Sequence, residues 1–404
     1  MLITIPRRTP LYWAYLMLVI TILMGMVHKL ANTDLTRRMS LVCKLLLMVI
    51  LVFCAVANIV REKKLYVDDI PIVIYVAYTL IISLVRGLLI FPYAFVDILT
   101  WPCLYLAFKA YTRKRAISNS FVWLTRISMM LFFAISVLLI AKHRMGFGNA
   151  GGVVFPIYYC LTFLPIYLYL EDENRRKHVY FLIVIGLLMI STKRAGTVVA
   201  AASYIIYLFS NTRVSEAIKH KKRKYRNYIF GLLVCFCGII VLDSVISLEI
   251  IERLKGIVND QGSGRTYIWS FVFKDFKKAN ESLRLFGHGY QAVYYQLKPF
   301  GVDRLAHNSF LELLYDYGYV GLSIFLLFFI NMIKKCILSF AYKDKKSPYM
   351  LITMVICIAF GVTSYLFEES AIMMPIAVFW GCFDGENRRK RTEKSIVIEG
   401  YTYE

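Results

Sequence analysis

The chain has 404 residues, of which 59% are hydrophobic and 18% are charged, and its formal net charge is +22. A soluble domain is about 45–50% apolar and about 25% charged, so this composition excludes an ordinary soluble protein. Several apolar runs are long enough to cross a bilayer as helices and lack the alternation of barrel strands. We therefore expect an all-α polytopic membrane protein whose basic residues flank its spans, rather than a nucleic-acid-binding protein.

The apolar runs predict about twelve transmembrane helices. We expect the first run to be a retained span, because no convincing small-residue cleavage site follows it. The nine cysteines lie in or beside apolar runs without a C-x-x-C pair, so neither a zinc site nor a disulfide framework is indicated. The predicted helices, in chain order, are 11–27, 40–60, 70–85, 91–108, 121–141, 152–170, 179–191, 195–210, 228–247, 308–333, 349–367 and 371–383.

The distribution of Lys and Arg orients these helices. With a cytoplasmic N-terminus, the cytoplasmic segments hold 29 basic residues and the short outer loops hold 8. This bias satisfies the positive-inside rule, so we expect both termini in the cytoplasm. The expected parts are helices one to nine in 1–247, a large extracytoplasmic loop in 248–306, helices ten to twelve in 307–383 and a basic cytoplasmic tail in 384–404.

The large outer loop is the one place where we expect a sizeable structure outside the membrane. Asn259, Asp260, Gly262 and Gly264 are turn formers near its start. From Arg265 to Lys278, apolar side chains recur at helical spacing. This stretch predicts an amphipathic helix that lies on the membrane surface.

His307 stands at the outer end of the tenth predicted span. Leu311 and Leu314 follow it at i+4 and i+7, so we expect the three residues to share one helical face. At a helix N-terminus the macrodipole disfavours a charged imidazolium, and a neutral imidazole can accept a proton. The alternative is a histidine that only caps the helix. Farther along the same span, the spacing of Gly318 and Gly321 predicts a bend or close helix packing.

Two arginines are candidate phosphate ligands. Arg194 lies at the outer mouth of two adjoining spans, and Arg265 opens the predicted outer helix. A guanidinium keeps its charge and offers a bidentate fork that matches phosphate oxygens. The alternative is that these arginines only set the membrane topology or snorkel to the headgroups, although the short outer loops are otherwise poor in basic residues.

Three motifs in order resemble the signature of the O-antigen ligase and polymerase superfamily. They are "GRTYIW", "LFGHGY" and "HNSFLELLYDYGYVG", and an upstream "STKRA" element at a span mouth is also similar. The matching positions are Gly264, Arg265, Trp269, Leu285, Phe286, Gly287, Gly289, His307, Asn308, Leu311, Leu314, Gly318 and Gly321, with Ser191, Arg194 and Ala195 upstream.

The resemblance implies a fold and an activity. The fold would be GT-C-like, and the enzyme would be a membrane-embedded glycosyltransferase of the bacterial inner membrane. The donor would be an oligosaccharide on undecaprenyl pyrophosphate at the outer face. By the resemblance, Arg194 and Arg265 would hold the pyrophosphate and His307 would activate the acceptor hydroxyl. It also admits a chain-length regulator protein as a partner, and it implies no cofactor.

Five other residues near the outer face are predicted to bind the substrate: Lys193, Tyr290, Arg304, Asn308 and Glu312. Lys193 and Arg304 would add positive field for the anionic lipid, and Asn308 stands beside the candidate base. Tyr290 and Glu312 would line the acceptor site, with helix solvation as the open alternative.

Further polar residues have simpler interpretations. We interpret His288 as part of the loop structure, Asp97 as a carboxylate that snorkels to water, and Asp316, like Glu312, as either acceptor-lining or solvated. No metal site is predicted, because the outer face shows no clustered carboxylate set with ligand-like spacing.

Two reactions and one transport function stay open at this point. A Wzy-type polymerase would move a growing chain onto a new lipid-linked repeat unit. A ligase would use the same donor and hand the finished glycan to lipopolysaccharide core or another acceptor. A lipid-linked sugar transporter is disfavoured, because we see no duplicated halves and the candidate residues gather at one face.

Overall fold

The structure is a computed structural model that describes residues 10–62, 66–88, 92–144, 155–191, 194–213, 265–298 and 305–401. These residues are almost entirely helical and form no strand, which confirms the all-α class. Five helical stretches are long and apolar enough to cross a membrane: α1 (Pro10–Ala31), α2 (Asp34–Glu62), α3 (Ile70–Val85) together with the 3-10 turn before it, α5 (Asn119–Arg144) and α14 (Ser309–Ala341). Three shorter apolar helices are α6 (Tyr158–Leu170), α8 (Arg194–Arg213) and α15 (Ser347–Thr363).

The remaining helices complete the bundle. They are α4 (Tyr93–Lys114), α7 (Asn174–Ile190), α16 (Ser370–Tyr401) and, in the outer segment, α11 (Arg265–Lys278), α12 (Glu281–Phe286) and α13 (Ala292–Leu297), with two 3-10 turns at Val67–Asp69 and Phe155–Ile157. Eleven of the predicted spans coincide with observed helices, and the span predicted at 228–247 lies outside the described residues. The number of membrane crossings therefore remains a prediction. Helix α16 continues through the expected basic tail to Tyr401, and the cytoplasmic position of this tail stays a prediction.

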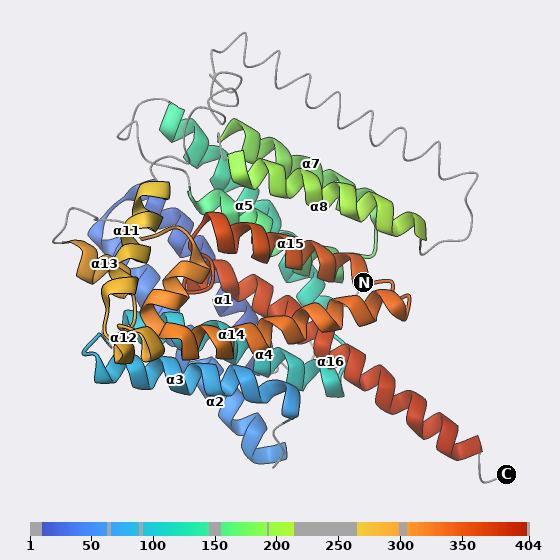
Figure 1. The fold of residues 1–404 in the computed structure, drawn as a ribbon. Coiled ribbons are helices and arrows are strands. Elements are labelled where there is room, and N and C mark those ends of the chain that lie inside the picture. The colour runs from blue at the N-terminus through green and yellow to red at the C-terminus, as the bar shows by residue number, and fades with distance from the viewer. Residues whose placement is uncertain are drawn as a thin grey trace.

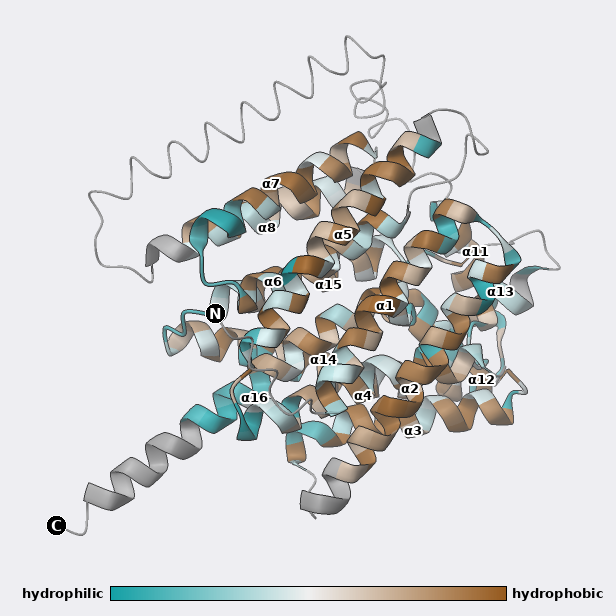
Figure 2. Cartoon of the chain, turned by 180° about the vertical axis from the view of Figure 1, so that it is seen from behind, coloured by the Kyte–Doolittle hydropathy of each residue, from teal (hydrophilic) through white to brown (hydrophobic). Residues whose placement is uncertain are grey.

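The surface of α2 shows why this bundle belongs in a bilayer. Large apolar side chains recur every three or four residues along one face, and each is between 52% and 71% exposed. They are Val42, Leu46, Val49, Phe53 and Val56. Figure 2 shows apolar residues along the outward surfaces of α1, α2 and α3, whereas hydrophilic residues gather on the part of α16 beyond the bundle. Lipid tails are the natural neighbours of such a stripe.

The two ends of the bundle differ. Figure 1 shows α11, α12 and α13 together at one end, while α16 extends beyond the bundle at the other. At the α16 end, Lys109 lies 2.5 Å from Asp69 and 2.6 Å from Asp384, and Lys335 lies 2.7 Å from Asp384. All four side chains are largely buried, so each charge needs its partner. This paired network occupies the end that the sequence predicts to be cytoplasmic.

Two glycines allow α16 to pack closely on α4. A Cβ at Gly381 would lie 2.6 Å from the carbonyl oxygen of Tyr105, and one at Gly385 would collide with Thr112 and Lys109. Small residues four apart bring helix backbones together in membranes, where close packing replaces the hydrophobic effect as the driving force. This contact fixes the position of α16. It thereby also fixes the turn before α16, which lies at the other end of that helix from its C-terminus.

Candidate active site

The "LFGHGY" motif forms a clamp on a kink in α14. Gly318 has φ +67° and ψ −171°, which interrupts the helix and frees the carbonyl oxygens of the preceding turn. The backbone N–H and the Nδ1–H of His288 donate to the Tyr315 oxygen at 3.2 and 3.0 Å, and the N–H of Gly289 donates to the Asp316 oxygen at 2.7 Å. The predicted bend at Gly318 is confirmed.

The close approach between these segments explains the glycines of the motif. A Cβ on Gly287 would collide with the backbone of Asp316 and Tyr317, and one on Gly318 would collide with the carbonyl of Leu285. His288 is buried and stacks on the ring of Tyr315 at 4.2 Å between ring centroids. Burial lowers the pKa of His288 below its usual 6.5, so its imidazole is neutral near pH 7. The prediction that His288 is structural agrees with these contacts.

The loop that carries His307 is held from both sides. The side-chain oxygen of Asn308 accepts from the N–H groups of Phe310 and Leu311 at 3.1 Å each, so Asn308 is the N-cap of α14. His307 precedes the cap with φ +53°, a left-handed backbone that is uncommon for a residue other than glycine. The prediction that His307 shares a helical face with Leu311 and Leu314 is therefore wrong. The asparagine ends the loop one residue after the histidine.

Glu312 fixes this loop from inside the bundle. Its Oε1 accepts from the N–H of Ala306, and it also bonds to the backbone of His307. The side chain is fully buried, so the interpretation of Glu312 as a solvated helix residue is wrong. The Glu312 carboxylate thereby accepts hydrogen bonds from backbone N–H groups of the loop, which have no acceptor within the α14 backbone itself.

The "GRTYIW" motif reaches the same loop. The indole Nε1–H of Trp269 donates to the Ala306 oxygen at 2.7 Å, so α11 is bonded to the residue before His307. Arg265 is the first residue of α11 and lies one turn before Trp269 on the same face. The predicted helix 265–278 matches α11, and Ile268, in addition, packs in a small core beside Tyr315.

The "STKRA" element approaches α11 through Tyr158. A Cβ on Gly196 would lie 2.6 Å from the Tyr158 ring, and the Tyr158 hydroxyl bonds to the Gly196 backbone in the first turn of α8. The charge of Arg265 acts on the same hydroxyl. Arg194 opens α8, two residues before this contact, although its side chain lies outside the described residues. Tyr158 thus packs on the start of α8 and lies within range of the charge of Arg265 at the start of α11.

Two predicted substrate-binding residues are not among the described residues. Lys193 precedes α8, and Arg304 precedes the His307 loop. Their predicted contribution to the positive field remains an expectation.

Three carboxylates meet beneath the His307 loop. One oxygen from each of Glu312, Asp316 and Glu368 lies within 4.8 Å of the other two. Glu312 and Asp316 are fully buried, and Glu368 is 4% exposed. The statement that the outer face lacks a carboxylate cluster is therefore wrong. Glu312 and Asp316 follow each other at i+4 on α14, and Glu368 comes from the turn between α15 and α16.

A hydroxyl on α14 holds that turn in place. Ser309 donates to the Ser364 oxygen at 3.1 Å and accepts from the Leu366 N–H at 2.6 Å. The turn is therefore bonded to the first residue of α14, and Glu368 is held against the helix.

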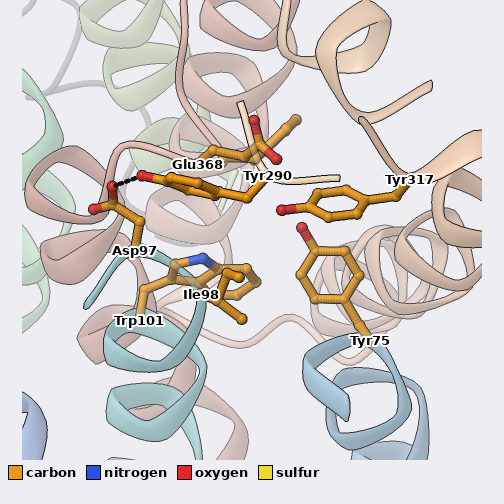
Figure 3. A pocket seen from close by; sticks show the side chains of 8 residues that line it. Tyr75, Asp97, Ile98, Trp101, Tyr290, Tyr317 and Glu368 are labelled. Carbon is orange, nitrogen blue, oxygen red and sulfur yellow. Dashed lines mark hydrogen bonds between the residues drawn. The ribbon is translucent and has the colours of Figure 1, made fainter. Parts of the chain in front are cut away.

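Asp97 belongs to the same buried region. It accepts from the Tyr290 hydroxyl at 2.6 Å and from Ser370 at 2.7 Å, so it bonds to protein donors rather than snorkelling to water, as the sequence had suggested. Figure 3 shows this bond, with the hydroxyls of Tyr75 and Tyr317 directed to the centre of the pocket. Asp97, these tyrosines and Glu368 line a small cavity of about 10 Å³, which has room for about one water molecule.

A wider groove lies on the outer segment. It has a volume of about 340 Å³ and is lined by Arg86, Asp275, Lys278 and His288, among others. Arg86 also donates to the Gly287 oxygen at 3.0 Å, so one of its functions is to support the clamp. The mixed polar lining suits sugar hydroxyls, which are both donors and acceptors.

Sequence reasoning missed Glu368 and its neighbour Glu369. The signal was a Glu-Glu pair between two apolar runs on the outer side, a position where carboxylates are costly unless they have a function. The carboxylates of Asp97, Glu312 and Asp316 were weighed from the sequence, but this pair was not.

The comparisons with known proteins agree with the motifs. Residues 179–326 match the family model Wzy_C, described as O-antigen ligase. The matched stretch contains α8, α11 and the His307 loop, and it ends within α14. A search of curated proteins found no match. The match over residues 179–326 therefore supports the resemblance to the O-antigen ligase and polymerase superfamily.

Proposed function

We propose that the protein is a glycosyltransferase that joins undecaprenyl-pyrophosphate-linked repeat units into a surface polysaccharide, either O-antigen or capsule. The reaction would occur at the outer face of the bacterial inner membrane, with both termini in the cytoplasm. The observation that carries the proposal is the bond from Trp269 to Ala306, which joins the helix of Arg265 to the loop of His307. In this proposal, Arg265 would be the cation for the diphosphate and His307 the base for the acceptor, on segments that this bond connects.

The proposed step is a displacement at the anomeric carbon of the growing chain. A hydroxyl of the new repeat unit attacks this carbon and forms the new glycosidic bond. The bond from the carbon to the diphosphate oxygen breaks, and undecaprenyl pyrophosphate leaves with the bonding electrons. The hydroxyl proton passes to the imidazole of His307.

Arg265 and Arg194 would stabilise the leaving group. Negative charge grows on the bridging oxygen as the bond breaks, and fixed guanidinium groups in a site of low dielectric favour that charge without reorganisation. The loss of one such group costs on the order of 10²–10³ in rate. Lys193 and Arg304 would add to the positive field at the same water boundary.

The contacts of the assisting residues refine their proposed roles. The Asn308 oxygen caps α14, and Glu312 bonds the loop backbone, so both would position His307. Tyr290 bonds Asp97 in the buried region below the loop, which favours support of the site over a contact with the acceptor. The polar groove beside Arg86 and Lys278 is the region in which we expect the glycan to rest.

A deletion strain complemented with variants tests this proposal. His307→Ala and Arg265→Ala are expected to insert normally but to stop chain extension on a glycan ladder. Lys274→Ala is the matched control, because Lys274 is an exposed cation on the same helix as Arg265. Normal ladders from both site variants, with confirmed membrane insertion, would refute the site.

The ligase is the second candidate, because the family match carries that description. It predicts that the deletion strain accumulates long glycan on the lipid carrier. The polymerase predicts single repeat units on the carrier or on the final acceptor. Separation of the lipid-linked and acceptor-linked pools distinguishes the two reactions. A chain-length regulator would change the ladder distribution without abolishing extension.

A further inference from the structure

Apart from the bond of Glu312 to the His307 loop, the carboxylate cluster beneath that loop has no role in the proposed reaction. Four of its oxygens are buried and have no hydrogen-bond donor among the described residues. They are Oε2 of Glu312, Oδ2 of Asp316 and both oxygens of Glu368. The hydroxyls of Tyr317 and Tyr365 approach Glu368, but they form no bond of ordinary length and angle. Buried polar atoms are rarely left in this state, so the cluster requires a partner.

The arrangement resembles a set of metal ligands held by an outer layer of hydrogen bonds. The second oxygen of Glu312 accepts from the Ala306 N–H, and the second oxygen of Asp316 accepts from the Val293 N–H at 3.3 Å. Each bond fixes its carboxylate and leaves the remaining oxygen for the cluster. Such backbone bonds to ligating carboxylates are typical of built metal sites, where they orient the ligands.

Size and charge select the kind of ion. Three buried carboxylates carry up to three negative charges, and a divalent cation offsets two of them. Their oxygens lie within 4.8 Å of one another. Oxygens this close can share one ion, because two ligands bonded to it at about 2.3–2.6 Å lie at most about 4.6–5.2 Å apart. The small cavity beside Glu368 has room for about one further water ligand.

We propose that Glu312, Asp316 and Glu368 bind one hard divalent cation, with Ca²⁺ preferred over Mg²⁺. Carboxylate oxygens are the ligands that both ions take, but Mg²⁺ keeps several waters, and the cavity has no room for them. The ion joins three segments: the His307 loop through Glu312, the segment after the clamp through Asp316 and Val293, and the turn before α16 through Glu368. Its function is to position the histidine loop, and only this last clause rests on the proposed function.

The test uses the purified full-length protein in lipid nanodiscs. After chelation and removal of the chelator, calorimetric titration with Ca²⁺ is expected to show one binding site per chain. Bound metal is counted by mass spectrometry after desalting. The thermal unfolding midpoint is expected to rise with Ca²⁺ concentration, because an ion that binds only the folded state stabilises it.

Three variants and one control separate the cluster from other carboxylates. Glu368→Gln, Asp316→Asn and Glu312→Gln each remove one charge with little change of shape, and each is expected to weaken Ca²⁺ binding on the order of 10- to 100-fold or more. Glu281→Gln is the control, because Glu281 is exposed on α12. Asp316→Asn carries the test if the Glu368 variant fails to fold.

Several outcomes would overturn the inference. They are the absence of stoichiometric metal in the wild type, midpoints that do not change between chelator and Ca²⁺, and unchanged binding in the three variants. Equal or tighter Mg²⁺ binding would overturn the calcium preference. No glycan enters these measurements, so their failure leaves the proposed transferase function standing, and a failed ladder assay leaves the ion site standing.

Discussion

The interlocked glycines at the α14 kink give the sharpest test of how the outer segment is held. In Gly318→Ala, the new methyl group would enter the space occupied by the carbonyl of Leu285. The backbone at this position, φ +67° and ψ −171°, is almost exclusively adopted by glycine. The variant is expected to release the clamp formed by residues 285–289 while the membrane helices stay folded.

The magnitude follows from two separate costs. Forcing an alanine into this backbone region costs about 1–3 kcal/mol. Overpacking against a fixed backbone carbonyl costs about 1–3 kcal/mol more. The sum, about 2–6 kcal/mol, increases the population of the opened outer segment by about 30-fold or more. Opening also withdraws the bonds that His288 and Gly289 make to α14.

Limited proteolysis of the purified protein measures this opening, with cleavage sites located by mass spectrometry. Cleavage between residues 279 and 298 is expected to accelerate in Gly318→Ala. Gly186→Ala is the matched control, because Gly186 lies within α7 with no atom within 4 Å of its added Cβ. Alanine there is expected to be neutral or to stabilise by up to about 1 kcal/mol. Equal cleavage rates in the two variants would show that the clamp does not depend on the glycine.

Three other changes probe the remaining contacts. Trp269→Phe removes the bond to Ala306 and is expected to lower chain extension by about 5- to 150-fold at normal membrane levels, since an unmade buried bond costs about 1–3 kcal/mol; a full ladder would contradict it. The pKa of His288 is lowered by burial, so the free energy of unfolding is expected to fall as pH drops below about 6.5, where only the unfolded state gains the proton; His288→Asn should flatten this dependence in thermal scans. Asp384→Asn leaves the ammonium group of Lys109 with one partner fewer and is expected to cost about 3–5 kcal/mol, and the addition of Lys109→Met should recover part of that loss.

The sequence predicted well those features that depend on local periodicity. Helix 265–278 was identified by the recurrence of apolar residues such as Ile268 and Val272, and both are buried in the structure. The bend at Gly318 followed from glycine in a long span. His307 was wrongly assigned to the helical face of Leu311 and Leu314, because the preference of asparagine for the N-cap, which places Asn308 at the start of α14, was not used.

The acidic cluster could not be predicted from spacing. Glu312 and Asp316 are four residues apart, and this spacing of two carboxylates occurs as often on a solvated helix surface as at a ligand site. Glu368 joins them only because Ser309 bonds the turn before α16, and because Gly381 lets α16 pack closely on α4. These are contacts between segments far apart in the chain. The role of Asp97 was misjudged for the same reason, since its partners Tyr290 and Ser370 come from distant segments.

The two buried charge clusters indicate which end of the bundle binds ligands. At the α16 end, three acids and three bases pair directly among the described residues: Asp68, Asp69 and Asp384 with Lys109, Lys335 and Arg388. Such a network is complete within the chain and holds helices together. At the α11 end, carboxylate oxygens of the described residues are buried without donors, and these groups lie below a strained loop that carries a histidine. Uncompensated charge is costly to retain unless something outside the chain completes it. The chemistry is therefore expected at the α11 end, where the O-antigen ligase motifs also converge.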